Sequence, residues 1–432
     1  MNDLPLFPSK DRRKKAEGHE AEFGVPTFCG SFLRQLGDDW VLYHPLEDKL
    51  LVLNPTAKIV WDLFGWGYRA QDIATRFARH FGIPEEQTAR DVGQVLADLT
   101  EGRPSGEREQ TPVGLWGNDP ASLSDGNDGP ADCGAFRFGQ SRVRVLSSVA
   151  ELDDAFFSRF RHRALGSGSD ELEISRDNGG YSLKFRGEIA AEAQTISQAA
   201  ARLVELLLSL EHCGKPMLAF CHAAAVSRAG RSLLMPGSSG TGKSTLTAFL
   251  VANGFAYLGD DLIAIGDDDM ALLPLPTCLS IKAGSWPILE SLYPVLPNLA
   301  ILHRYGRSIR YVEPRGNYES LEAASAPSAI VFPAYSEGAE TRLQALPPVE
   351  TMIHLLGAHA RLSHPGNSTK LAELIRFVER TPAYLLSYGE LTVAMNAIDG
   401  LLPADAGASA ATWQRPATPS CPPHGAGQSS NA

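Results

Sequence analysis

The stretch GSSGTGKS, residues 237–244, decides the fold of the larger part of this chain, and we call it the glycine loop. It fits the pattern G-x-x-x-x-G-K-S, in which glycines allow successive backbone N–H groups to converge on one anion. In this pattern Lys243 would reach the β- and γ-phosphates of a nucleotide, and the Ser244 hydroxyl would contact Mg²⁺. We therefore expect ATP and Mg²⁺ here, with the nucleotide bound by Gly237, Ser238, Ser239, Gly240, Thr241, Gly242, Lys243, Ser244 and Thr245.

The segments on both sides of the glycine loop support this interpretation. SLLMP, residues 232–236, has the length and apolar character of a buried strand, and residues 244–254 have a helical pattern. A helix at that position would direct its positive end toward the bound phosphates. A strand, a glycine-rich turn and a helix in this order favour a phosphate site over a glycine-rich turn without a ligand.

Two adjacent carboxylates follow the next predicted strand. Residues 255–258 form an apolar run, and Asp260 and Asp261 come 17 and 18 residues after Lys243. One carboxylate can hold a divalent metal ion, and the other can accept the proton of an attacking hydroxyl. A second acidic run, residues 267–269, is better explained as a solvated turn between strands.

An isolated histidine, His222, lies in the apolar segment LAFCHAAAV, 15 residues before Gly237. Its spacing alone leaves open whether it is a functional group or a satisfied core residue, which is the commoner case. Together with the glycine loop and the Asp pair, however, it resembles the catalytic domain of HPr kinase/phosphorylase. That family has a histidine on the strand before the loop, the motif G-x-S-G-x-G-K-S, and an Asp-Asp pair after the next strand.

The resemblance implies roles for these residues. Asp260 would be the base for a substrate serine, with His222 beside it, and Lys243 completes the predicted catalytic set. Ser244 and Asp261 are the predicted metal ligands. The resemblance also implies a mixed sheet of the HPr kinase/PEP-carboxykinase type over residues 133–402 and is compatible with a homo-oligomer.

One feature of that family is missing from this sequence. The glutamate-containing signature tied to phosphorolysis is replaced by LPLPTCLSIKAGSWPILESLYP, residues 273–294, so neither phosphorylase activity nor HPr as a substrate follows. Lys282 in this stretch could face a phosphate or lie on the surface. Arg307, Arg310 and Arg315 could contact a phosphate or an acidic peptide, or could form a solvated face.

The N-terminal part has a different pattern. WVLYHP and LLVLNP, residues 40–45 and 50–55, are apolar runs on either side of a polar turn and predict a β-hairpin. Helical patterns then begin at Pro55, cover residues 70–82, and begin again at Pro84. A hairpin plus three short helices is the outline of a winged-helix fold. The predicted fold class is therefore α+β for this domain and α/β for the larger one.

The charge of the chain argues against a nucleic-acid partner for this winged-helix outline. Residues 38–102 carry 11 Asp and Glu against 6 Lys and Arg, a net charge of −5, and the whole chain has a net charge of −11. Because a nucleic-acid backbone is bound mainly by Lys and Arg, such a surface would repel a duplex. The domain is better explained as a platform for a protein or peptide.

Three stretches make this platform similar to the PqqD family, the recognition domain of enzymes that modify ribosomally made peptides. They are LVLNPTAKIVWDLF, AQDIATRF and DVGQVLADL, within residues 30–102. The resemblance implies a leader peptide that adds a strand to the hairpin edge, with the last helix as the other wall of the groove. The predicted peptide contacts are Leu50, Val52, Asn54, Val92, Val95 and Leu99.

The composition divides the chain into five parts. We expect a disordered tail over residues 1–22, the PqqD-like domain over 23–102, a flexible linker over 103–132 that isolates the two domains, the kinase-like domain over 133–402, and a second disordered tail over 403–432. No apolar run reaches the roughly 18 residues of a membrane span. The charged start and six scattered cysteines favour a cytoplasmic protein without a membrane partner.

These features together predict an ATP-dependent serine/threonine kinase for a ribosomally made precursor peptide or small protein captured by the N-terminal domain. Two alternatives stay open. The first is a kinase for free serine or another small alcohol. The second is a non-catalytic adaptor in which ATP binding switches delivery of the peptide to a partner enzyme.

Overall fold

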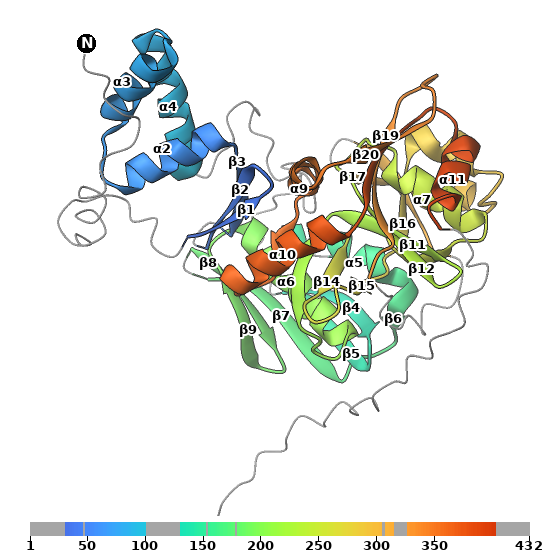
Figure 1. Ribbon diagram of the computed structural model, residues 1–432. Coiled ribbons are helices and arrows are strands. Elements are labelled where there is room, and N and C mark those ends of the chain that lie inside the picture. Colours follow the sequence, from blue (N-terminus) through green and yellow to red (C-terminus); the bar gives the residue numbers. More distant parts are fainter. Residues whose placement is uncertain are drawn as a thin grey trace, which may run out of the picture.

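The computed structural model describes residues 31–45, 48–100, 130–152, 154–177, 179–304, 307–314 and 326–402. The predicted tails, nearly all of the predicted linker and Arg315 lie outside these residues. In Figure 1 a group of helices at the N-terminal end connects through a small sheet to a larger body of sheets and helices. In the part of the chain that is described, no helix has both the length and the apolar character needed to cross a membrane.

The small sheet and the helices after it form the N-terminal domain. The predicted hairpin is confirmed, but a third strand precedes it, in the order β1-β2-β3 with antiparallel neighbours. The added strand has the sequence FLRQL, whose exposed Arg34 and Gln35 conceal its apolar pattern. The elements are β1 (Phe32–Leu36), β2 (Asp39–His44), β3 (Lys49–Leu53), α2 (Pro55–Gly65), α3 (Ala70–Phe81) and α4 (Glu85–Thr100).

The three predicted helices are also confirmed, and caps mark the start of α2 and the end of α3. Asn54 precedes α2, and its side chain accepts a hydrogen bond from the Ala57 amide at 2.8 Å. Gly82 ends α3 in the left-handed conformation. One core holds the three helices together and consists of Val60, Leu63, Ile73, Ala74, Phe77, Val92 and Leu96.

The small sheet has two apolar faces, and this corrects the expectation of isolated domains. Leu42 and Leu53 face the N-terminal helices, where Leu99 of α4 joins them. Val41 and Leu50, on the other face, belong to one buried cluster with side chains of α9 (Pro348–Gly357) and α10 (Ser368–Arg380) of the larger domain. A sheet that is apolar on both faces must bury both, so the two domains share a hydrophobic core whatever the linker does.

A polar contact also joins the two domains. The Tyr43 hydroxyl donates to Asp48 at 2.9 Å, and Nη2 of Arg202 in the larger domain lies 3.9 Å from the Asp48 carboxylate. All three groups are largely buried. The sheet therefore has one fixed orientation on the larger domain.

The first part of the larger domain is a six-stranded sheet in the order β6-β4-β5-β7-β8-β9, covered by α6 (Ile196–Glu211). Its first strand begins two residues before the predicted boundary at 133. The other elements are β4 (Ala131–Phe138), β5 (Ser141–Ser147), η2 (Ala150–Leu152), α5 (Asp154–Phe157), η3 (Ser158–Arg163), β6 (Ala164–Leu165), β7 (Asp170–Asp177), β8 (Gly180–Phe185) and β9 (Glu188–Ala193).

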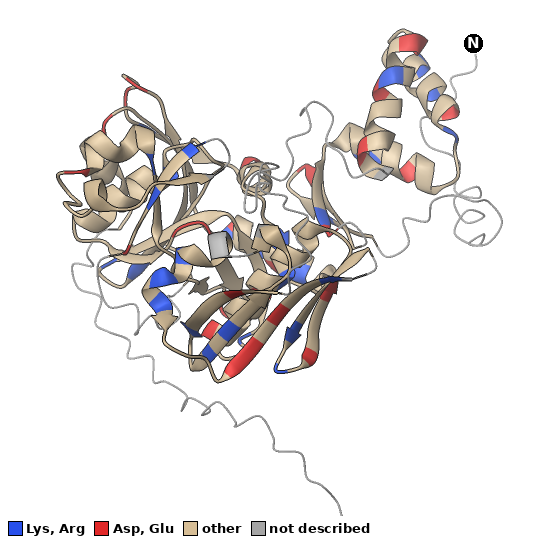
Figure 2. Cartoon of the chain, turned by 180° about the vertical axis from the view of Figure 1, so that it is seen from behind, with Lys and Arg blue, Asp and Glu red and all other residues tan. Residues whose placement is uncertain are grey.

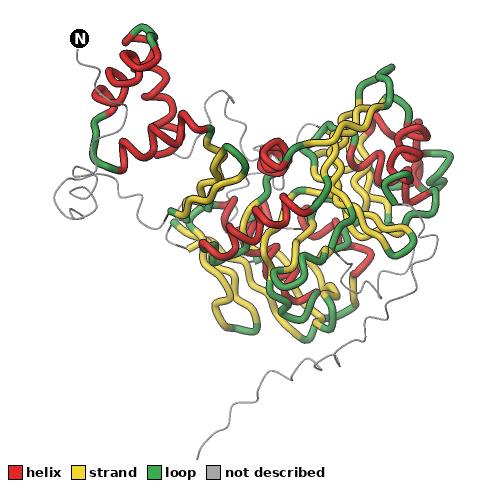
Figure 3. Tube along the Cα trace, viewed as in Figure 1, coloured by secondary structure: helices red, strands yellow, loops and turns green. Residues whose placement is uncertain are grey.

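A second six-stranded sheet, in the order β13-β11-β12-β19-β22-β20, carries the glycine loop. β12, β19 and β22 are parallel neighbours, while β11 and β20 run antiparallel, so the sheet is mixed as predicted. Figure 3 shows strands between helices in this part of the molecule. The strands are β11 (Ala223–Arg228), β12 (Arg231–Pro236), β13 (Ala256–Gly259), β19 (Ala329–Tyr335), β20 (Arg342–Leu346) and β22 (Ala383–Tyr388).

Helices cover both faces of this sheet because its strands are apolar on both sides. Alternate residues of β11, such as Ala224 and Val226, pack with α7 (Lys243–Ala252) and α11 (Leu391–Asp399). The residues between them, such as Ala223 and Ala225, pack with α9 and α10. This layering is typical of an α/β domain.

Two small sheets complete the surroundings of the glycine loop. One has the order β15-β14-β10-β21, and the other the order β16-β18-β17. Their strands and the short helices near them are β10 (Met217–Cys221), β14 (Ile263–Gly266), β15 (Leu272–Pro274), β16 (Leu279–Lys282), η4 (Ala283–Ser285), α8 (Trp286–Leu289), η5 (Leu296–Asn298), β17 (Leu302–Arg304), β18 (Arg307–Val312) and β21 (Arg361–Leu362).

Candidate functional site

The glycine loop has the predicted setting, because it joins β12, which ends at Pro236, to α7, which begins at Lys243. Gly240 and Gly242 have φ angles of +105° and +87°, a region that residues with a side chain rarely adopt. A Cβ atom on Gly242 would also collide with the Tyr388 hydroxyl. Glycine is therefore required at Gly242 by both conformation and contact.

Neighbouring strands hold the glycine loop through backbone hydrogen bonds. The Gly237 amide donates to the carbonyl of His222 at 3.2 Å, and the Tyr335 amide donates to the carbonyl of Thr241 at 3.0 Å. The Tyr388 hydroxyl donates to the carbonyl of Gly242 at 3.3 Å. Because hydrogen bonds fix the loop from both sides, the surrounding fold sets its conformation.

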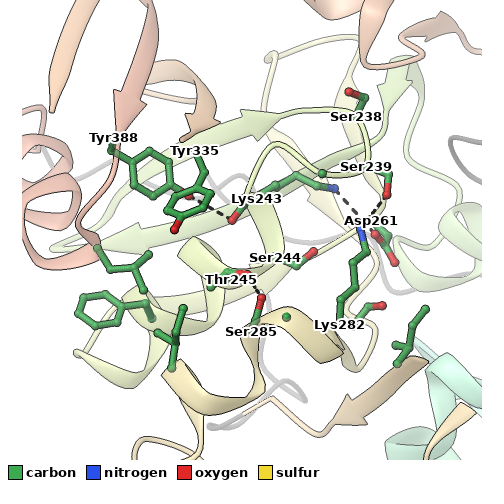
Figure 4. Close-up of a pocket in the computed structure, with 18 of the residues that line it drawn as sticks. Ser238, Ser239, Lys243, Ser244, Thr245, Asp261, Lys282, Ser285, Tyr335 and Tyr388 are labelled. Atoms are coloured by element: carbon green, nitrogen blue, oxygen red, sulfur yellow. Dashed lines mark hydrogen bonds and ion pairs between the residues drawn. The ribbon is translucent and has the colours of Figure 1, made fainter. Parts of the chain in front are cut away.

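The predicted catalytic residues come together at the start of α7; Figure 4 shows Lys243 and Asp261 in this region. The ammonium nitrogen of Lys243 lies 3.2 Å from Nε2 of His222, 3.4 Å from Oδ1 of Asp260 and 3.8 Å from Oδ1 of Asp261. Lys243 is itself buried, with 4% of its surface exposed. The structure thus joins three segments that are separated in sequence into one charged cluster.

The two aspartates differ in their surroundings. Asp260 has no exposed surface and does not line the cavity, and its Oδ1 pairs with the Lys243 ammonium at 3.4 Å. Asp261 lines the adjacent cavity, has a φ of +89°, and has Arg159 at 3.7 Å. The carboxylate that a substrate can reach is therefore Asp261, whereas Asp260 lies beneath it.

The pKa values of the two carboxyls shift in opposite directions. Burial raises the pKa of Asp260 above its ordinary value, against the opposing effect of the Lys243 charge. Burial alone would also raise the pKa of Asp261, but the positive charges of Lys243 and Arg159 outweigh it and lower this pKa to about 2. Asp261 is therefore ionised at neutral pH.

His222 links the cluster to the backbone. Its Nδ1 lies 3.0 Å from the carbonyl oxygen of Asp261, and its Nε2 faces the Lys243 ammonium. These partners suit a neutral ring in which Nδ1 donates and Nε2 accepts. Burial, and then the charge of Lys243, lower the pKa of His222 to about 3, which agrees with the neutral form. The contacts describe a positioning residue for Lys243 and Asp261.

A cavity of about 670 Å³ opens over this cluster. Pockets that hold a small molecule or cofactor commonly measure about 300–1,000 Å³. The glycine loop forms one wall, and the short sheet of β16 and β18 contributes Ser280, Lys282, Ile309 and Tyr311. Aromatic rings of Tyr335 and Tyr388 lie on the other side, 5.6 Å apart. The space is large enough for a nucleotide.

Several residues of this cavity could not be found from the sequence. Arg159, Tyr335 and Tyr388 come from segments distant from the glycine loop and belong to no recognisable motif. Ser285, whose hydroxyl lies 2.6 Å from that of Thr245, follows Lys282 in the stretch that departs from the HPr kinase pattern. The chain fold alone brings them to the site.

The basic residues without an assigned role in the sequence analysis occupy different positions. Lys282 and Arg307 both donate to the Ser239 hydroxyl, at 2.7 and 2.8 Å. The guanidinium of Arg310 instead lies 4.0 Å from the ring centroid of Trp286. The sequence left the roles of these residues open, and the structure separates Arg310 from the other two.

The donor groups near the glycine loop are compatible with a magnesium ion bound together with a nucleotide. Within the described residues there is no cluster of three or more His, Cys, Asp or Glu side chains that could hold a metal ion. Mg²⁺ in nucleotide sites, however, needs only one or two protein ligands besides phosphate and water. Ser244 lines the cavity, and the Asp260 carboxylate lies beside both Ser244 and Lys243, so Ser244 and Asp260 provide a suitable pair.

The predicted peptide groove is not assembled as expected. Leu50 and Val52 face α9 and α10 of the larger domain, on the opposite side of the small sheet from Val95 and Leu99. Leu51 and Leu53 face the helices instead, because side chains alternate along a strand. Val92 is buried in the helical core, and Asn54 is the helix cap described above.

The edge on which that prediction depends is nevertheless present. Among the described strands, β3 pairs only with β2 and so ends the small sheet. Figure 2 shows acidic and basic positions interspersed along the N-terminal helices.

Comparison with known proteins identifies the class of the N-terminal domain. Residues 39–103 match the family model of coenzyme PQQ synthesis protein D (PqqD). The match covers β2, β3 and the three helices and leaves β1 outside. It supports the predicted PqqD-like domain in this part of the chain. A search of the curated proteins finds no match.

Proposed function

We propose that this protein is an ATP-dependent kinase that phosphorylates a serine or threonine of a ribosomally made precursor peptide held by its PqqD-like domain. The observation that carries the proposal is the cluster of Lys243, His222 and Asp261 at the glycine loop, on a cavity of about 670 Å³. The match of residues 39–103 to PqqD supports a peptide as the substrate.

In this proposal the glycine loop binds the phosphates of ATP through its backbone N–H groups, and Lys243 neutralises their charge. Ser244 and Asp260 would hold Mg²⁺, which when bound offsets further phosphate charge. Asp260 suits this task because its carboxylate lies beside Ser244 and Lys243 and is shielded from solvent. The predicted roles of the two aspartates are thereby exchanged.

Asp261 then serves as the base. The hydroxyl oxygen of the substrate forms a bond to the γ-phosphorus as the bond from that phosphorus to the β–γ bridging oxygen breaks. The electron pair of the broken bond stays on ADP, and the hydroxyl proton passes to Asp261 and then to water. His222 holds Lys243 and the Asp261 backbone in place during this transfer.

The position of the small sheet suggests how the peptide reaches the site. A leader peptide that pairs with the free edge of β3 would add a strand to a sheet that is already docked on α9 and α10. Binding there would raise the local concentration of the rest of the peptide near the kinase domain. Backbone pairing supplies affinity, and specificity comes from side chains.

The exchange of roles can be tested with two matched variants. Asp261→Asn should lower the rate of phosphotransfer by roughly 10²–10⁴ while nucleotide binding persists, because an amide cannot accept the proton. Asp260→Asn should instead raise the Mg²⁺ concentration needed for half-maximal activity. Initial rates measured over a series of Mg²⁺ concentrations separate the two effects. If Asp260→Asn lowered the rate while nucleotide binding persisted, and Asp261→Asn raised the Mg²⁺ requirement, Asp260 would be the base and Asp261 the metal ligand, as the resemblance to HPr kinase implies.

The two alternative functions give different results with the wild-type protein. A kinase for a small alcohol would phosphorylate free serine in the absence of peptide, and an adaptor would bind MgATP without forming a phosphorylated product. Deletion of residues 1–102 does not discriminate cleanly, because it would expose the apolar patch on α9 and α10. Product analysis with the full chain is therefore the appropriate test.

A further inference from the structure

Two positively charged side chains approach the glycine loop from the sheet of β16 and β18: Lys282, which lines the cavity, and Arg307, which lies outside its lining and contacts the loop at Ser239. Lys282 ends β16, Arg307 begins β18, and the two strands are antiparallel, with Lys282 opposite Ile309. Because side chains alternate along a strand, Arg307 and Ile309 point to the same side as Lys282. That side faces the cavity, since Lys282 and Ile309 both line it.

Both cations use one neutral oxygen as their partner. Nζ of Lys282 donates to Oγ of Ser239 at 2.7 Å, and Nη1 of Arg307 donates to the same atom at 2.8 Å. Within the described part of the chain, neither side chain has a carboxylate within ion-pair distance. Burial, and then the charge of Arg307, lower the pKa of Lys282. Two adjacent cations on a hydroxyl are an arrangement that an anion would stabilise.

The positions of Lys282 and Arg307 indicate which anion they would bind. Ser239 belongs to the glycine loop, whose backbone N–H groups suit the α- and β-phosphates. Lys282 lines the same cavity as Lys243 and Asp261, and Figure 4 shows its side chain at the end of the cavity where Asp261 and Ser239 lie. A group bound between Lys282, Arg307 and Lys243 would therefore be the terminal phosphate.

From this geometry we propose that Lys282 and Arg307 bind the γ-phosphate of ATP and leave Ser239 when the nucleotide enters. The proposal rests on the proposed kinase function and adds two catalytic residues to it. During transfer, charge spreads over the equatorial oxygens of the phosphoryl group, and positive side chains that contact these oxygens stabilise it. Lys282 and Arg307 would supply that charge from within the same chain.

The test is calorimetric titration of the full chain with MgATP and with MgADP. Lys282→Met and Arg307→Met should each weaken MgATP binding roughly 10- to 100-fold, the loss expected for one hydrogen bond to a charged group. Binding of MgADP, which lacks the γ-phosphate, should change by less than about threefold in the same variants. Lys282→Arg should keep most of the MgATP affinity.

Arg310→Met is the matched control. Arg310 lies on the same strand as Arg307 but at a position of opposite parity, and its guanidinium stacks on Trp286 rather than on the loop. The control loses the same charge and should bind both nucleotides as the wild type does.

The other possible results of the titrations contradict either the γ-phosphate assignment or the kinase proposal. Equal losses for MgATP and MgADP, or no loss for either, would overturn the γ-phosphate assignment while leaving the kinase proposal intact. An equal loss of MgATP affinity in Arg310→Met would show that the loss comes from the change in net charge, and it would also overturn the assignment. A wild-type protein that binds neither nucleotide would reject the kinase proposal, and this site with it.

Discussion

At the scale of single residues, Lys243 is the centre of the site. The sequence predicts that it contacts the β- and γ-phosphates of a nucleotide. In the structure it is buried and lies within 4 Å of His222, Asp260 and Asp261. Its charge therefore stabilises the folded protein as well as the proposed ligand.

Lys243→Met tests this double role. The variant should lose detectable MgATP binding, and its free energy of unfolding should fall by roughly 3 kcal/mol, because the buried Asp260 and the partly buried Asp261 lose their cation. Urea unfolding measures the loss. Lys58→Met, which breaks a less buried pair with Asp62 on α2, should cost only about 0.5 kcal/mol. Equal losses in the two variants would contradict the buried cluster.

The low pKa of His222 predicts a pH dependence of stability. The folded state keeps the ring neutral down to about pH 3, whereas the unfolded chain takes up a proton near pH 6.5. Stability from this group is therefore complete above pH 6.5 and falls as the pH drops toward 3, by about 1.4 kcal/mol per pH unit. Asp261 contributes in a lower window, since its stabilisation is lost only as the pH falls from about 4 toward 2.

His222→Gln isolates the histidine contribution. Between pH 6 and 5, without nucleotide, the unfolding free energy of the variant should fall less steeply than that of the wild type by about 1.4 kcal/mol. Chemical denaturation at each pH provides the values. Parallel curves for the two proteins would show that His222 is not held neutral.

At the scale of elements, the sequence predicted well wherever a local signal exists. Asn54 and Pro55 predicted the start of α2, and the glycine loop predicted the strand and helix that flank it. The strand β1 was not predicted from the sequence, because Arg34 and Gln35 interrupt its apolar pattern. Contacts between distant segments carry no local signal, so Arg159 and Tyr388 could not be placed at the site.

The strand β3 was predicted correctly, but the role assigned to its side chains was wrong. Its edge position was predicted, but its inward face was assigned to the wrong partner. Leu50 and Val52 look like groove residues only if the other face of the sheet meets solvent. The larger domain covers that face, and strand alternation then assigns Leu51 and Leu53 to the helices.

The backbone of the glycine loop gives a prediction at this scale. Gly242→Ala places a Cβ at a φ of +87° and against Tyr388, so the loop must shift and both stability and MgATP binding should fall. Gly284→Ala is the control, because this glycine lines the same cavity but has open space around its Cα and no positive φ. Thermal unfolding with and without MgATP compares them, and equal behaviour would argue against a strained, preformed loop.

At the scale of the whole molecule, the shared core is the feature that the sequence did not indicate. A Gly-, Pro- and Ser-rich segment between two domains favoured independent units. The apolar residues on the second face of the small sheet, including Leu36 and Val41, belong instead to a cluster with α9 and α10. Peptide capture and phosphotransfer would thus occur on one continuous body.

Leu36→Ala tests this continuity. Removal of the buried side chain should cost roughly 2–5 kcal/mol, and hydrogen exchange should speed up in α10 as well as in β1 and β2. Arg34→Ala, an exposed change on the same strand, should stay within about 0.5 kcal/mol of the wild type. Faster exchange confined to residues 31–100 would indicate two independent domains.

The captured peptide should itself become phosphorylated. The most direct measurement is the intact mass of short peptides encoded beside the gene, after incubation with the full chain and MgATP, with peptide binding measured in parallel. We predict that a peptide that binds gains one phosphoryl group on serine or threonine, and that Asp261→Asn abolishes the gain without abolishing binding. If a peptide that contains serine or threonine binds tightly to the MgATP-saturated protein and yet remains unmodified, the proposed kinase function is wrong.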